Sequence, residues 1–214
     1  MEQYKNILVV IDEQNFDFKA IDRALYFASK TNSTITITLF SYQGRLGTLL
    51  NWFNSEHDTS YEQEETIADK RHHIDTYIQS ISTDVSVTVS PFICFSFEDI
   101  LSVSSRCYID TIFVSANEHA FWRDFALPPI DLQLMARSPY PVFIVKSHDW
   151  YSGATILSAV EPLAQDEAHI QLTNKIVEES THLSKLFKGE CHFVDCYFGE
   201  DNSISLNSED KENR

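Results

Sequence analysis

Basic side chains are scarce in this sequence of 214 residues. Lysine and arginine number 16 against 32 aspartates and glutamates, which gives a formal net charge of −16 and a pI near 4.7. Non-specific binding to nucleic acid or to an anionic membrane needs basic patches. The composition therefore argues against both partners, and its simplest reading is solubility.

Cysteine is also infrequent, with four residues and no CxxC pair. Cys191 and Cys196 flank His192, a combination that would suit a metal ion. On a strand, however, residues five apart face opposite sides of the sheet. The pattern favours reduced cysteines packed in a cytosolic protein, so we expect no bound metal and a cytoplasmic location.

Long apolar runs are missing as well. No segment approaches the roughly 18–20 apolar residues that a membrane helix needs, so no membrane insertion is expected. The chain starts Met-Glu-Gln-Tyr-Lys and continues directly into a strand-like run, which indicates no secretory signal.

No catalytic motif stands out either. His119 next to Glu118 imitates an acid/base pair, but the spacing places no nucleophile beside it. His72 and His73 lie in a highly charged helical stretch and are expected to be solvated. We therefore predict no catalytic residues and no cofactor.

What the sequence does contain is an alternation of strand-like and helix-like segments. Apolar runs or strict alternation predict strands, and apolar stripes with helical spacing predict helices. The predicted strands are 5–11, 34–40, 85–89, 111–115 and 141–145, and the predicted helices are 18–30, 58–81, 97–105 and 130–136. This alternation predicts an α/β fold with a mostly parallel sheet and helices on both faces.

The chemistry of the strands also indicates their order. Continuous apolar strands lie at the centre of such sheets, which places 7–11 and 111–115 side by side. The result is a flavodoxin-like, Rossmann-like doubly wound sheet of five strands in the order 3-2-1-4-5, with a crevice between strands 1 and 4. Asp12 and the segment from Ser115 to Asn117 follow those two strands, and are therefore candidate ligand contacts. Asp12 would alternatively bond to the loop after its strand, and Ser115 and Asn117 would alternatively form a turn.

The opening of this fold is repeated later in the chain. Residues 7–12 read Ile-Leu-Val-Val-Ile-Asp and residues 156–161 read Ile-Leu-Ser-Ala-Val-Glu. A helix-like stretch and a further strand follow the second run, which predicts a partial second copy of the fold. We expect a first domain at 1–147, a partial strand–helix–strand domain at 148–198, and a disordered acidic tail at 199–214.

These motifs resemble the universal stress protein family. Ile7–Asp12 matches the family's first strand with its adenine-contacting Asp, and 137–145 resembles its closing short helix, Pro-Val pair and final strand. Phe40-Ser41-Tyr42 and the tandem arrangement are similar to the two-domain E type. The resemblance covers 1–198, implies a second domain cut short, and adds Ser41 to the candidate binding residues Asp12, Ser115 and Asn117.

The resemblance also locates the family's phosphate loop, Gly-x2-Gly-x9-Gly-Ser/Thr. Its glycines let the backbone approach the phosphates, and a helix N-terminus supplies free N–H donors. In this sequence those positions are Ser115, Glu118, Pro128 and Pro129. Glu118 adds negative charge, and the prolines have no N–H to donate. Glu161 stands at the Asp position of the second copy, whose own phosphate loop would lie beyond residue 198. We therefore expect no ATP binding.

The sequence thus predicts a non-enzymatic universal stress protein with a degenerate nucleotide site, acting by binding and association. The alternative is a nucleotide-binding regulatory switch or weak nucleotide hydrolase that uses Asp12 and residues 115–119. The apolar connection Leu46–Phe53 must be covered, either as a lid over a small apolar ligand or by a partner. The edge strand Pro141–Val145 is expected to pair with a second chain as a homodimer, or with the second domain.

Overall fold

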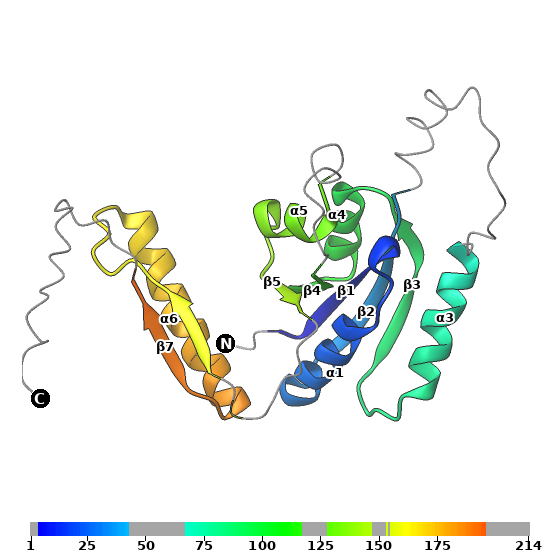
Figure 1. The fold of residues 1–214 in the computed structure, drawn as a ribbon, viewed down its shortest axis with the longest axis horizontal. Coiled ribbons are helices and arrows are strands. Elements are labelled where there is room, and N and C mark those ends of the chain that lie inside the picture. The colour runs from blue at the N-terminus through cyan, green and yellow to red at the C-terminus, as the bar shows by residue number, and fades with distance from the viewer. Residues whose placement is uncertain (1–3, 43–66, 117–127, 147–152, 154, 196–214) are drawn as a thin grey trace, which may run out of the picture. The chain divides into compact units, whose positions relative to one another are not determined.

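A five-stranded parallel sheet forms the centre of the first of two units into which the chain divides, 1–148 and 149–214. The computed structural model describes residues 4–42, 67–116, 128–146, 153 and 155–195. The strand order is β3-β2-β1-β4-β5, which confirms the predicted doubly wound topology (Figure 1). All of the pairings are parallel, so the carboxyl ends of the strands meet at one edge of the sheet.

Most elements of this unit lie close to their predicted positions, and residues 58–66 of the helix predicted at 58–81 lie outside the described residues. The strands are β1 (Asn6–Asp12), β2 (Thr34–Phe40), β3 (Val87–Cys94), β4 (Thr111–Ser115) and β5 (Val142–Val145). The helices are η1 (Glu13–Asn15), α1 (Lys19–Thr31), α3 (Ile67–Ser80), α4 (Phe97–Arg106) and α5 (Ile130–Arg137).

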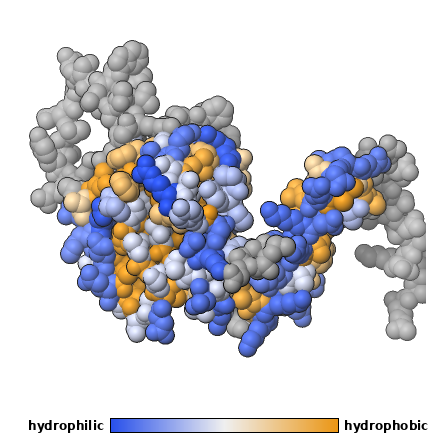
Figure 2. Space-filling view, turned by 180° about the vertical axis from the view of Figure 1, so that it is seen from behind, coloured by the Kyte–Doolittle hydropathy of each residue, from blue (hydrophilic) through white to orange (hydrophobic). Residues whose placement is uncertain are grey.

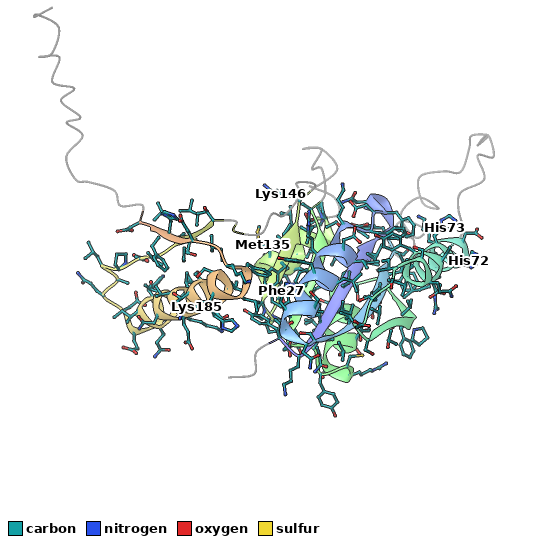
Figure 3. All side chains as sticks on the ribbon, turned by 90° about the horizontal axis from the view of Figure 1, so that it is seen from below. Phe27, His72, His73, Met135, Lys146 and Lys185 are labelled. Atoms are coloured by element: carbon teal, nitrogen blue, oxygen red, sulfur yellow. The ribbon has the colours of Figure 1, made fainter. Side chains whose placement is uncertain are left out.

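One face of the sheet is covered by α1. Its apolar stripe is buried, and the helix ends at Asn32 in the left-handed conformation (φ 56°), a favoured way to stop a helix. Phe27 of α1, labelled in Figure 3, packs with Phe113 of β4 and Phe143 of β5, whose rings stack with centroids 4.5 Å apart. Aromatic side chains thus fix α1 over the centre of the sheet.

The opposite face packs against α4 and α5 in one continuous core cluster. Ser96 caps α4, since its side chain accepts a hydrogen bond from the Asp99 N–H (3.1 Å). The cluster joins residues of β1 to β4, or of their ends, to both helices, and partly buried residues of β5 pack against it. Its members are Leu8, Val10, Phe40, Tyr42, Cys94, Phe97, Ile100, Val103, Ile109, Ile112, Val114, Ile130 and Leu134, with Leu101, Tyr140, Val142 and Ile144 packed around them.

The third strand differs from its predicted range of 85–89. It runs from Val87 to Cys94, because a register irregularity opposite Ile37–Leu39 lets it continue through Pro91. Proline cannot donate to a strand ladder and is tolerated on edge strands and at bulges. β3 is such an edge strand, which reconciles Pro91 with the longer strand.

The second unit contains a parallel pair of strands and one helix. Its elements are β6 (Ile156–Ala159), α6 (Glu167–Phe187) and β7 (Cys191–Val194). Small polar residues make the contact between α6 and β6: Ser158 Oγ lies 2.5 Å from Ser180 Oγ, and both serines are buried. Leu157, next to Ser158 on the strand, is 69% exposed. This unit therefore has an apolar strand face that its own helix does not cover.

Apolar side chains reach the surface in both units, as Figure 2 shows. In the part of the chain that is described, no helix has the length and apolar character required to cross a membrane.

Candidate functional site

The carboxyl ends of β1 and β4 lie side by side, in the register Val10 to Val114. This arrangement brings together two of the residues selected from the sequence, Asp12 and Ser115. Both are buried, at 2% and 5% exposure. In an open α/β sheet this switch point is the usual ligand position, so the neighbourhood of Asp12 decides what the crevice can hold.

A tyrosine occupies the centre of this site. The Tyr42 hydroxyl donates a hydrogen bond to Asp12 Oδ2 (3.0 Å) and accepts one from the backbone N–H of Ile130 (3.0 Å). The side chain is buried, and its ring meets Phe40 edge to face with centroids 4.8 Å apart. One phenol therefore connects the end of β1 to the start of α5.

The N-terminus of α5 is shaped by the two prolines. Pro129 is its N-cap residue and makes no side-chain cap, and neither Pro128 nor Pro129 has an N–H. Their carbonyls instead accept hydrogen bonds from Gln133, from its N–H to Pro129 O (3.1 Å) and from its Nε2 to Pro128 O (2.6 Å). Tyr42, from the end of β2, thus supplies the cap that the local sequence does not provide.

Ser115 is tied to the loop that follows β1. Its hydroxyl donates to Asp17 Oδ1 at 2.6 Å, and Asp17 Oδ1 also accepts the N–H of Lys19 at the start of α1 (3.1 Å). Beside it, Asn15 Nδ2 donates to the carbonyl of Ala116 (2.9 Å). These bonds place Ser115 in the turn network that closes the crevice between β1 and β4.

Ser41 and Glu13 border Tyr42. Ser41 is fully buried, and its N–H donates to the carbonyl of Cys94 (2.9 Å). Glu13 Oε1 accepts the N–H of Tyr42 (2.6 Å), whereas Glu13 Oε2 is buried and has no hydrogen-bond partner among the described residues. Together with Asp12 and Asp17, Glu13 surrounds the crevice with carboxylates, which repel an anionic group such as a phosphate.

Other candidates fall outside the described residues or away from this site. Outside them lie Asn117, Glu118, His119, Cys196, the segment Leu46–Phe53 and the tail 199–214. His72 and His73 are exposed on α3 (Figure 3). Within the described ranges, no three histidine, cysteine or acidic side chains group in a way that could hold a metal ion.

The residue that sequence reasoning did not select is Tyr42 itself. It stood inside the Phe40-Ser41-Tyr42 motif, two residues beyond the end of β2, where a parallel strand delivers side chains to the crevice. That position could have identified Tyr42 as a candidate site residue. Nothing in the sequence indicates its hydrogen bond to Ile130, which is 88 residues away.

The environment of Tyr42 keeps its phenol neutral. Burial, and then the negative charge of Asp12, raise the pKa of Tyr42 well above its ordinary value. A neutral phenol retains the proton that it donates to Asp12. The hydrogen-bonded chain from Asp12 to Ile130 is therefore a structural one at physiological pH.

Comparisons with known proteins agree with the fold. No family model matches the chain. The chain is 25% identical over 203 residues to universal stress protein E of Escherichia coli, covering 92% of this chain and 63% of that protein. It is likewise 25% identical to a universal stress protein E homolog of Haemophilus influenzae, with 91% and 65% covered. A crystal structure of a universal stress protein from Archaeoglobus fulgidus superposes with a TM-score of 0.62 at 13% identity, covering 96% of this chain and 70% of that one. The chain thus spans less than two thirds of the length of the curated relatives it matches.

Replacing Tyr42→Phe should lower the free energy of unfolding by about 1–3 kcal/mol at pH 7, because the buried Asp12 oxygen and the Ile130 N–H each lose a hydrogen bond. The wild-type protein should also lose stability as the pH rises above about 10, where the phenol ionises only in the unfolded chain. That alkaline loss should be smaller in the variant. Urea unfolding at pH 7, 9 and 10.5 measures both effects, and identical pH profiles would contradict the role of Tyr42.

Proposed function

We propose that the chain is a universal stress protein similar to the tandem E type, and that it acts by binding and association in a stress response, without catalysis and without ATP. The observation that carries this proposal is the double hydrogen bond of Tyr42. The phenol takes both the Asp12 oxygen and the helix N–H that a ligand in the crevice would need.

Three features support the exclusion of a triphosphate. Pro128 and Pro129 have no N–H groups for phosphate oxygens. The Ile130 N–H is already donated to Tyr42. The carboxylates of Asp12, Glu13 and Asp17 surround the same end of the sheet, and would oppose a polyanion unless cations intervened. A nucleotide that used Asp12 Oδ2 or the Ile130 N–H would first have to break a hydrogen bond of Tyr42.

Isothermal titration with Mg-ATP should therefore give no binding heat at millimolar nucleotide. The same titration of Tyr42→Phe tests whether the phenol alone is responsible for the exclusion. We expect no binding there either, since the prolines remain. Micromolar affinity in the wild-type protein would contradict the proposal and support a nucleotide-responsive switch.

A small apolar ligand is the second element of the proposal. The crevice end of the sheet adjoins a large apolar cluster that includes Phe40, Tyr42 and Ile130. Native mass spectrometry of protein purified gently from cells should then show a mass above that of the polypeptide, removed by organic extraction. If protein purified in mild detergent-free buffer has the mass of the polypeptide alone, that result would count against an apolar ligand.

Association is proposed to occur through β5, an edge strand of the sheet. The Ile112 N–H bonds to Pro141 O (2.9 Å) and the Ala116 N–H bonds to Val145 O (2.8 Å), so Pro141 and Val145 face β4. Successive residues of a strand alternate in the side to which their N–H and C=O groups point, so Phe143 also faces β4, whereas Val142 and Ile144 direct these groups to the other side. Among the described residues no strand pairs with this outer side of β5, so the backbone groups of Val142 and Ile144 are available for pairing with a second chain.

The substitution Val142→Pro removes one outward N–H of β5 and leaves the bonds to β4 in place. The dissociation constant of the pair should rise about tenfold, because proline at this position cannot donate the backbone hydrogen bond to the second chain. Val87→Pro is the matched control, because Val87 begins the opposite edge strand and its N–H also faces away from its neighbour. Sedimentation velocity over a concentration series measures both. A strictly monomeric wild-type chain, or equal effects of the two variants, would contradict pairing through β5.

A further inference from the structure

The hydrogen bonds of Tyr42 reach a helix that continues directly into the edge strand. α5 begins at Ile130, whose N–H is bound by Tyr42, and its last turn leads through Ser138 to Pro141 at the start of β5. The connection is short and bonded at each step. Ser138 N–H donates to Leu134 O (3.0 Å), Ser138 Oγ donates to Tyr140 O (2.9 Å), and Pro141 O accepts from Ile112.

Packing connects the same parts of the molecule. Ile130 and Leu134 of α5 are fully buried in the cluster that contains the Tyr42 ring. Val142 and Ile144 of β5 are partly buried against that cluster. A shift of α5 would therefore change the packing beneath β5, since closely packed side chains move between discrete arrangements and do not deform continuously.

The start of α5 has no cap from its own N-cap side chain. That N-cap residue is a proline, and the Leu132 N–H bonds to the neighbouring Asp131 Oδ1 (2.9 Å). Helix ends without partners are costly when buried, and Ile130 is fully buried. The phenol of Tyr42 is thus a long-range polar contact that holds this end of α5 against the sheet.

We propose that Tyr42 is a latch that couples the crevice between β1 and β4 to association at β5. While the phenol bridges Asp12 and Ile130, α5 holds Val142 and Ile144 in the arrangement that pairs. A group that takes the Asp12 carboxylate displaces the phenol, releases the start of α5 and weakens pairing. This inference rests on the proposed association through β5 and adds its regulation.

Amide hydrogen exchange by NMR, on the full chain, tests the latch itself. In Tyr42→Phe the Ile130 amide should exchange about tenfold faster, as expected for the loss of one buried hydrogen bond. Tyr4→Phe is the matched control, because Tyr4 is as buried as Tyr42 (5% exposed each) and precedes β1 at the other end of the sheet. Unchanged exchange at Ile130 in Tyr42→Phe would overturn the latch, whatever the oligomeric state.

Sedimentation velocity on the same variants tests the coupling. Self-association should weaken about fivefold or more in Tyr42→Phe, within the usual range of coupling between sites, and should stay at the wild-type value in Tyr4→Phe. Faster exchange at Ile130 with unchanged association would overturn the coupling and keep the association at β5. A wild-type chain that is monomeric at all concentrations would overturn the coupling and the proposed association together, while the exchange experiment still decides whether Tyr42 holds α5.

Discussion

The pairing of buried polar groups at the carboxyl end of the parallel sheet is the constraint on which this structure depends. Every strand of the sheet ends there, so carboxylates, hydroxyls and helix N–H groups are brought out of water together. Pairing these groups is strongly favoured, since an unpaired buried polar group costs about 1–3 kcal/mol. In this protein Tyr42 is hydrogen-bonded to both Asp12 and Ile130, and Asp17 accepts a hydrogen bond from Ser115.

At this edge the chain pairs its own polar groups with one another. In related folds a crevice ligand would satisfy donors and acceptors at the strand ends. Here a buried phenol does so, and two prolines remove N–H groups that would otherwise need an acceptor. Stability and binding compete for the same atoms. Tyr42, Pro128 and Pro129 stabilise this edge of the sheet, and the same three residues are the basis for proposing association and not nucleotide binding.

The elements and their order followed from local patterns because the forces that set them are local or depend on composition. The apolar run of β1, the alternation in β2 and the helical stripe of α1 each report which faces are buried, and the central place of β1 and β4 follows from continuous burial. β3 was predicted too short because its prediction rested on the alternation of residues 85–89 alone, and Pro91 follows that alternation. Only its place at the sheet edge makes proline acceptable there.

The sequence by itself determined the doubly wound sheet, the position of the crevice, and the presence there of Asp12, Ser115, Pro128 and Pro129, because strand ends and proline chemistry are readable residue by residue. The tertiary structure alone decided what those residues contact. Tyr42 meets Asp12 across 30 residues and Ile130 across 88, and Ser115 meets Asp17 across 98. Hydrogen bonds of about 3 Å depend on how separate elements finally pack together, and no local sequence pattern predicts that packing.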